Sequence, residues 1–167
     1  MVKCGPMMPP LLGKAELEQF VAGFIKNKDR YRNAVFANGS PLWMLDIQTL
    51  KNNAAAFSTA FKTYFPETSF YFAVKSNNHP LVSKALVESG FGLDVASGKE
   101  LTNALASGSS DIIFSGPGKT VEELTLAVKH RQSTTLLLDS MGELGRLAAV
   151  LAHHRIESPI NVGIRLT

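Results

Sequence analysis

The chain has 167 residues, 45% of them hydrophobic, and a net charge of +3 spread along its length, which allows one domain with a substantial core and gives only weak support for nucleic-acid binding. Its single cysteine, Cys4, excludes an internal disulfide and fits a reducing compartment. No stretch approaches the length of a membrane span and residues 1–13 lack the apolar region of a signal peptide, so the sequence predicts a soluble cytoplasmic protein.

Residues 1–37 are predicted to form a region of their own, a loose leader followed by a helix. The helix is expected over residues 15–28, because four apolar side chains recur there at helical spacing. These side chains are Leu17, Phe20, Val21 and Phe24. The turn Asn38-Gly39-Ser40-Pro41 then leads into a short strand predicted over residues 42–45.

The rest of the chain, residues 38–167, is predicted to form one α/β domain. Strands are expected over residues 69–74, 91–96, 111–114, 135–138 and 160–166. Helices are expected over residues 49–64, from Pro80 onward, and over residues 100–106, 121–129 and 141–154. Buried strands that alternate with amphipathic helices are typical of parallel α/β architecture.

Three of the strand-to-helix joints carry the same pattern, a Ser or Thr followed three residues later by Glu. The pairs are Ser97 with Glu100, Thr120 with Glu123, and Ser140 with Glu143. This pattern is the capping box, in which the two side chains bind free N–H groups at the start of a helix. It predicts helix boundaries and assigns no function.

Three charged residues interrupt predicted strands, although a strand covered on both faces is almost continuously apolar. They are Lys75 after Phe-Ala-Val, Asp94 after Phe-Gly-Leu and Arg165 after Val-Gly-Ile. An unpaired buried charge costs several kcal/mol, so each is expected to have a partner or a ligand. Near the carboxyl ends of parallel strands they can converge on one site, where barrel and open-sheet enzymes place their chemistry. The alternative is a structural ion network.

Lys75 closes the apolar run of residues 70–74 and is expected to lie half out of water. Desolvation there favours the neutral amine, which Schiff-base chemistry with an aldehyde requires. The alternative is a lysine whose ammonium group simply reaches water from the strand end. Glu100 is either only a capping residue or also a member of the same polar group, one helical turn beyond the strand of Asp94.

Other motifs give weaker signals. The segment of residues 115–120 contains Gly-Lys-Thr, but Ile113 stands where a phosphate-binding P-loop requires glycine, so nucleotide binding is disfavoured. Lys119 is then expected to be a loop residue near the active face and Thr120 a helix cap. His79 is expected at a helix start, in a capping or surface role. No His, Cys, Asp and Glu cluster has metal-ligand spacing.

Five segments, in order along the chain, resemble one family of enzymes. They lie within residues 72–77, 91–101, 112–124, 139–144 and 162–165. As an ordered set they resemble the pyridoxal-phosphate-dependent decarboxylases with an alanine-racemase-like barrel, which act on ornithine, lysine, arginine or diaminopimelate. The resemblance covers about residues 38–167 and implies about five of the eight βα units of a (β/α)8 TIM-type barrel.

The resemblance implies roles for four residues. Lys75 would hold pyridoxal 5'-phosphate as an internal aldimine. Asp94 and Arg165 would belong to the polar group around the cofactor ring, with Arg165 near the phenolic oxygen, and Glu100 would join this group less directly. The substrate amino acid would displace Lys75 and lose its carboxylate as carbon dioxide, while the cofactor takes up the electrons. Full-length members are expected to form homodimers.

The chain is short for this family, because a complete (β/α)8 barrel takes about 250 residues. Four elements of the family have no counterpart here: the histidine that stacks on the ring, the glycine-rich phosphate site, the acid facing the pyridine nitrogen, and the carboxy-terminal β-domain. The chain is therefore expected to be an amino-terminal portion that is weakly active or inactive alone. A smaller departure is Ser76, where the family often has alanine.

Two other functions remain open. One is a non-catalytic regulatory homologue that pairs with a full-length decarboxylase. The other is an alanine-racemase-type protein, which is mildly disfavoured because Asn77-Asn78-His79-Pro80 follows the lysine where racemases carry a Tyr-Gly-rich turn. The identity of the substrate amino acid is open as well, since the residues that would contact its side chain have no counterpart in the chain.

Overall fold

The computed structural model describes residues 13–165, which form seven α-helices, one 3-10 helix and five strands. One compact unit ends at Leu45 and a second begins at Asp46. Within the described residues, no helix is both long and apolar enough to cross a membrane.

The first unit contains two helices, α1 (Lys14–Lys26) and α2 (Lys28–Asn38), neither of which has a buried residue. The rings of Phe24 and Tyr31 stack across the joint between them at 5.0 Å. The predicted helix over residues 15–28 is confirmed as α1, whereas α2 was not predicted. The predicted strand over residues 42–45 is wrong, because that segment has no regular secondary structure and pairs with no strand. The predicted leader, up to residue 12, lies outside the described residues, and the domain boundary after residue 37 stays a prediction.

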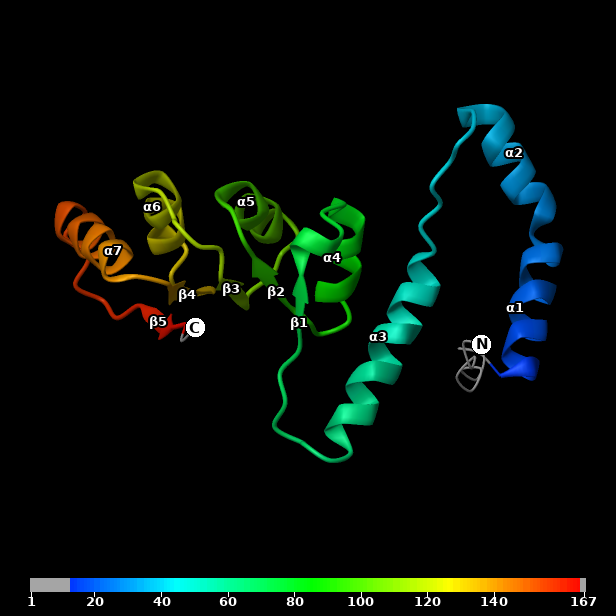
Figure 1. Cartoon of the computed structure of the whole chain (residues 1–167), viewed down its shortest axis with the longest axis horizontal. Helices are drawn as coiled ribbons and strands as arrows, with labels where there is room; N and C mark the ends of the chain where they lie inside the picture. The colour runs from blue at the N-terminus through cyan, green and yellow to red at the C-terminus, as the bar shows by residue number, and fades with distance from the viewer. Residues whose placement is uncertain (1–12, 166–167) are drawn as a thin grey trace, which may run out of the picture. The chain divides into compact units, whose positions relative to one another are not determined.

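The second unit alternates strands and helices as predicted (Figure 1). Its helices are α3 (Ile47–Lys62), α4 (Pro80–Val87), α5 (Gly98–Ala106), α6 (Val121–Lys129) and α7 (Met141–His153). Its strands are β1 (Tyr71–Ala73), β2 (Gly92–Val95), β3 (Ile112–Phe114), β4 (Thr134–Leu138) and β5 (Asn161–Ile164). A 3-10 turn, η1 (Val74–Ser76), follows β1, so the first strand is shorter than predicted.

The five strands form one parallel sheet in the order β1-β2-β3-β4-β5. Helices α4 to α7 all lie on the same side of this sheet (Figure 1). A doubly wound sheet reverses its strand order and carries helices on both faces, whereas a (β/α)8 barrel keeps sequential order with its helices outside. The sheet is therefore a five-strand portion of a barrel-type fold, as predicted.

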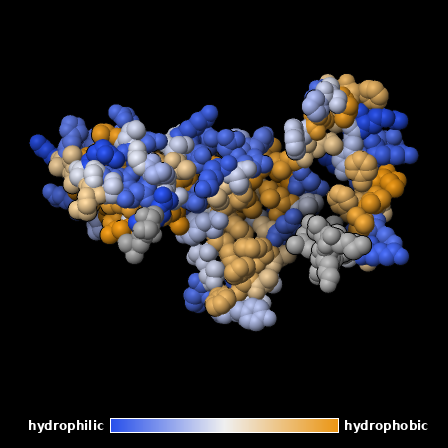
Figure 2. Space-filling model, viewed as in Figure 1, coloured by the Kyte–Doolittle hydropathy of each residue, from blue (hydrophilic) through white to orange (hydrophobic). Residues whose placement is uncertain are grey.

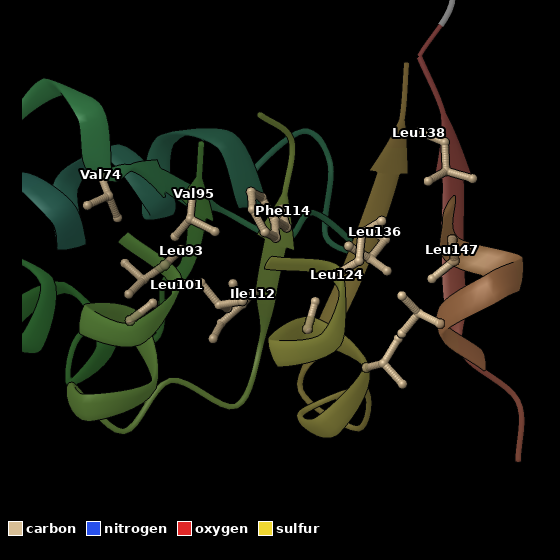
Figure 3. Packing of buried hydrophobic residues seen from close by; sticks show 14 residues of the cluster. Val74, Leu93, Val95, Leu101, Ile112, Phe114, Leu124, Leu136, Leu138 and Leu147 are labelled. Carbon is tan, nitrogen blue, oxygen red and sulfur yellow. The ribbon is translucent and has the colours of Figure 1, made fainter. Parts of the chain in front are cut away.

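The core lies between the sheet and the covering helices (Figure 3). The register aligns Leu93 with Ile112 and Val95 with Phe114, and all four side chains are fully buried. They pack against Leu101, Leu124 and Leu147 from α5, α6 and α7. Each fully buried side chain of this size contributes roughly 1.5–3 kcal/mol, so this layer accounts for most of the hydrophobic stabilisation.

Helix α3 packs on the edge of the sheet near β1 and α4. A small cluster of Ala54, Val82 and Leu86 lies between the two helices, and Lys51 forms an ion pair of 2.6 Å with Glu88. Apolar residues reach the visible surface over α3 and the segment after it (Figure 2). Aromatic rings of this region contact one another around Phe70 at centroid distances of 5.5–6.0 Å.

The predicted helix starts are confirmed, with one difference in the capping. Ser97, Thr120 and Ser140 are the N-cap residues, and each hydroxyl accepts a hydrogen bond from the Glu N–H three residues later. Only Thr120 and Glu123 complete the capping box. Glu100 and Glu143 instead accept from the N–H of the residue before the cap. Their carboxylates thereby fix the strand end rather than the cap residue.

Candidate functional site

The face of the sheet opposite helices α4 to α7 carries the charged residues of the candidate site. Side chains alternate along a strand, so Asp94, between buried Leu93 and Val95, points away from the helices. Asp139 follows buried Leu138 and has the same orientation by continuation of β4. The Arg165 N–H donates to the Leu138 carbonyl, which extends the parallel ladder by one residue and places Arg165 beside Asp139.

Lys75 lies in η1, two residues beyond Ala73, which aligns with Asp94. Its side chain is exposed rather than half-buried, so the predicted desolvation is wrong for this structure. The reason is that η1 turns the chain out of the strand, and the buried residue of the turn is Val74. Among the described residues, Lys75 makes no hydrogen bond or ion pair, so no protein group holds its side chain.

Asp94 has a partner in the next loop. The Ser115 hydroxyl donates a hydrogen bond to Asp94 Oδ1 at 2.5 Å. The loop approaches β2 so closely that a Cβ at Gly116 would lie 1.9 Å from the Ala96 carbonyl oxygen. Only glycine fits at Gly116, and this close approach brings Ser115 to Asp94.

Glu100 holds the end of β2. Its Oε2 accepts a hydrogen bond of 2.8 Å from the Ala96 N–H, and its own N–H donates to the Ser97 hydroxyl. These contacts account for Glu100 as a structural residue that fixes the turn after Asp94. The contribution to catalysis that the resemblance implies stays a prediction.

Arg165 is paired with a residue that sequence reasoning missed. Its Nε lies 2.8 Å from Asp139 Oδ1, in an ion pair whose aspartate side chain is 16% exposed. The Asp139 carboxylate oxygens are buried, and neither accepts a well-aligned hydrogen bond within residues 13–165. Asp139 follows its strand directly, as Ser115 does, and Lys75 lies two residues beyond its own strand; this shared position at strand ends is the signal that could have identified Asp139.

A fully buried ion pair lies behind this polar face. The Nζ of Lys119 is 3.4 Å from Glu143 Oε1, and both side chains are 0% exposed. Lys119 Nζ also donates to the carbonyls of Gly116 and Leu137, at 2.7 and 2.5 Å, and lies 5.0 Å from the centre of the Phe114 ring. Lys119 is thus in a loop, as predicted, but is buried and fully engaged.

Glu143 completes the network. Its two carboxylate oxygens accept from the N–H groups of Lys119 and Asp139, each at 2.9 Å. Burial alone would raise the pKa of Glu143, but the hydrogen bonds from Asp139 and Lys119, together with the Lys119 charge, outweigh burial and hold that pKa below its ordinary value. Glu143 is therefore a carboxylate at neutral pH.

The predicted site residues lie at the same edge of the sheet, but they do not contact one another. Lys75, Asp94 and Arg165 all lie at the carboxyl ends of strands, but within the described residues no hydrogen bond or ion pair joins any two of them. His79 caps α4 as expected, since its Nδ1 accepts from the Leu81 N–H. Among the described residues, no group of three or more metal-ligating side chains is placed to hold an ion.

The fold and the site together define a portion of a (β/α)8-type barrel whose polar residues gather at the carboxyl ends of its strands, where barrel enzymes act. The family model "Pyridoxal-dependent decarboxylase, pyridoxal binding domain" matches residues 50–167. The chain belongs to this family of pyridoxal-dependent decarboxylases, whose cofactor is pyridoxal phosphate, and the predicted family is confirmed.

Curated relatives agree with this assignment. The diaminopimelate decarboxylase of Aquifex aeolicus is 34% identical over 123 residues, which are 67% of this chain and 28% of the relative. The diaminopimelate decarboxylase of Vibrio cholerae is 34% identical over 128 residues, 75% of this chain and 30% of the relative. The chain thus spans about a third of the length of the relatives it matches.

Solved structures give the same picture. Diaminopimelate decarboxylase from M. jannaschii in complex with L-lysine matches with a TM-score of 0.70 and 28% identity, over 80% of this chain and 31% of that one. Lysine/ornithine decarboxylase from Vibrio vulnificus, complexed with putrescine, matches with a TM-score of 0.62 over 93% of this chain and 38% of that one. At 21% identity, the second likeness supports the fold alone.

Proposed function

We propose that the chain is the amino-terminal part of a pyridoxal-phosphate-dependent decarboxylase of a basic amino acid, with Lys75 as the residue that binds the cofactor covalently. The observation that supports this role is the position of Lys75 just beyond the carboxyl end of β1, on a chain that belongs to the pyridoxal-dependent decarboxylases. Reaction with an aldehyde uses a primary amine, and no ion pair among the described residues has to be broken to release that of Lys75.

The other residues at this edge fit the same cofactor. Asp94 is held by Ser115 with one oxygen engaged, and Asp139 holds Arg165 through Nε. A guanidinium anchored through Nε keeps its remaining N–H groups available for an anionic oxygen. The edge therefore offers an amine, a carboxylate and a guanidinium to one ligand, while Glu100 fixes the turn beyond Asp94.

When bound, pyridoxal phosphate supplies the electron sink that accepts the electron pair released as a carboxylate departs. The part of Lys75 is to hold and release this group through its amine. Arg165 and Asp94 would orient the cofactor and offset its charges with their own. These roles require the side chains to be fixed in place, and the hydrogen bond from Ser115 to Asp94 and the ion pair between Asp139 and Arg165 provide that fixation.

The substrate class comes from the relatives. Diaminopimelate decarboxylases recur among them, and the solved neighbours include complexes with L-lysine. We therefore place a basic amino acid such as diaminopimelate, lysine, ornithine or arginine as the substrate of the whole protein. A homodimer of the full-length protein and a cytoplasmic location are parts of the same proposal.

The proposal is tested by trapping the cofactor on the chain. The purified chain is mixed with pyridoxal phosphate and reduced with borohydride, and the modified lysine is identified by peptide mass. Lys75→Ala is run beside Lys84→Ala, which removes another exposed lysine, on α4. We expect stoichiometric labelling at Lys75, which is lost in Lys75→Ala and retained in Lys84→Ala.

Labelling scattered over many lysines, and equal in Lys75→Ala, would overturn the cofactor role of Lys75 in this chain. The regulatory alternative would then gain support if the chain also co-purified with a longer decarboxylase. Selective labelling would be followed by assays of carbon dioxide release from diaminopimelate, lysine, ornithine and arginine.

A further inference from the structure

We infer that the buried Lys119–Glu143 pair is a positioning device, which fixes Asp139 and through it the guanidinium of Arg165. The inference concerns residues beyond those assigned above. Its functional meaning rests on the proposed function, because Arg165 matters only if it meets a ligand. The geometry itself can be tested without any cofactor.

The first step is that the pair holds the end of β4 where the chain enters Asp139. Lys119 Nζ donates to the carbonyl of Leu137, two residues before Asp139. Glu143 Oε2 accepts from the Asp139 N–H itself, and Ser140, the next residue, caps α7. The backbone that leads into Asp139 is thereby fixed by two contacts of one ion pair.

The second step is that Asp139 has no other restraint of comparable strength. Its carboxylate accepts no aligned hydrogen bond within the described residues, and its contact with Arg165 is the ion pair of 2.8 Å. The direction of the Asp139 side chain therefore follows from its backbone. If the backbone shifts, the partner of Arg165 shifts with it.

The third step connects this device to Asp94. Lys119 Nζ also donates to the Gly116 carbonyl, in the loop whose Ser115 binds Asp94. Arg146 Nε donates to the Lys119 carbonyl and holds the loop from α7. A single buried ammonium thus fixes the loop beside Asp94 and the strand end beside Arg165.

Charge explains why a polar device is needed. An apolar residue at Lys119 would satisfy packing but would leave the Gly116 and Leu137 carbonyls without a buried donor. Replacement of buried ion pairs by neutral groups often leaves stability unchanged, so stability alone gives weak grounds for such a pair. The contacts of the pair instead support a role in holding Asp94 and Asp139 in place.

The test uses the Nε–H signal of Arg165 in the proton–nitrogen NMR spectrum of the 18.1 kDa chain without cofactor, assigned through its loss in Arg165→Lys. In the wild-type chain we expect a slowly exchanging signal, because Nε is paired with Asp139. Asp139→Asn is the positive control and should abolish slow exchange. Lys51→Met breaks the ion pair between α3 and α4 and should leave the Arg165 signal unchanged.

The decisive variant is the double substitution Lys119→Met with Glu143→Gln, which removes both charges and leaves no lone buried ion. We expect a folded chain with a lower thermal midpoint, because the Gly116 and Leu137 carbonyls lose their buried donor, together with loss of the slow Arg165 signal. Retention of the signal in the folded double variant would overturn the inference. If the double variant does not fold, Glu143→Met alone is judged by the same signal, because methionine cannot accept from the Asp139 N–H, and slow exchange in the folded single variant likewise overturns the inference.

Failure of the proposed function has a different signature. If Lys75 is not labelled by pyridoxal phosphate, the exchange of the Arg165 signal still shows whether Lys119 and Glu143 position it. If Lys75 is labelled while the Arg165 signal is unchanged by substitution of Lys119 and Glu143, the proposed function stands and the positioning role is overturned.

Discussion

The ends of β1 and β3 lead into loops that each carry a lysine, and the two lysines have opposite environments. Lys75 is exposed and makes no hydrogen bond or ion pair with other described residues. Lys119 is 1% exposed and has an acid and two carbonyls as partners. The difference shows how one residue type separates into two roles: a buried ammonium must be satisfied by fixed groups, whereas an amine meant for a ligand must be left without them.

The largest expected effect on stability comes from replacing the buried lysine rather than the exposed one. Lys119→Met leaves Glu143 as a buried carboxylate without a counter-charge and should lower the free energy of unfolding by about 3–5 kcal/mol. Lys75→Met removes no contact within the described residues and should change it by less than about 0.5 kcal/mol. Urea unfolding followed by circular dichroism measures both. Equal losses in the two variants would contradict the contrast between the lysines.

The second effect comes from the acid of the buried pair. Glu143→Gln weakens hydrogen bonds to a charged group and should cost about 1.5–3 kcal/mol at pH 7. The folded-state pKa of Glu143 lies below its ordinary value of 4.5, so its contribution is complete above pH 4.5 and is lost as pH falls through the folded-state pKa. Unfolding curves across this window should converge for wild type and variant. A constant difference down to strongly acidic pH would be against this view.

A third comparison uses the two ends of β1, where Lys75 follows the strand and Tyr71 begins it. The Tyr71 hydroxyl donates to Asp111 at 2.7 Å. Burial, then this hydrogen bond and the charge of Asp111, raise the pKa of Tyr71 to about 12. The folded state retains this proton longer than the unfolded chain, so stability is full below pH 10 and falls as pH rises from 10 towards 12.

Absorbance titration should show that one of the three tyrosines ionises late, and Tyr71→Phe should remove that late phase. The same substitution should cost about 1–2 kcal/mol at neutral pH, through loss of a hydrogen bond to a charged acceptor. Three tyrosines that titrate together near pH 10 would show that Tyr71 is not held at Asp111.

The smallest expected effect comes from an ion pair with the same chemistry as Lys119–Glu143 but in water. Lys51 lies 2.6 Å from Glu88, and the hydrogen bond and charge of Lys51 hold the pKa of Glu88 below its ordinary value. Lys51→Met should leave the urea midpoint nearly unchanged, since solvent screens exposed pairs. An NMR titration of the Glu88 carboxyl should show its pKa rising towards 4.5. A large loss of stability would mean that burial is not what separates the two pairs.

Much of the fold could be predicted from local signals. The caps Ser97, Thr120 and Ser140 mark three helix starts, and the apolar runs between them identify the strands. Two local signals misled. The apolar segment of residues 42–45 has strand composition but no neighbouring strand, and α2 is polar enough to hide its helical period. Tertiary pairing, which composition does not contain, decides such segments.

The site was less accessible to sequence reasoning. Asp94 and Arg165 were recognised as charges within strands, and both do have partners. Those partners lie far along the chain: Ser115 is 21 residues from Asp94, and Asp139 is 26 residues from Arg165. Only the fold brings them together. The exposure of Lys75 was missed for a local reason, because a 3-10 turn begins at Val74, the last residue of the predicted strand, and includes Lys75.

The one-sided placement of the helices has a consequence for mutational scanning. Along β4, positions 134, 136 and 138 face the helices, and positions 135, 137 and 139 face the other way. Tolerance to substitution should therefore alternate with a period of two residues. Positions 136 and 138, which are buried leucines, should reject polar side chains by loss of folding, whereas position 134 already carries a buried threonine. Odd positions should accept many residues in a folding screen and become selective only when a screen for ligand binding is applied. On β4, the face on which a residue lies thus decides whether it is selected for stability or for function.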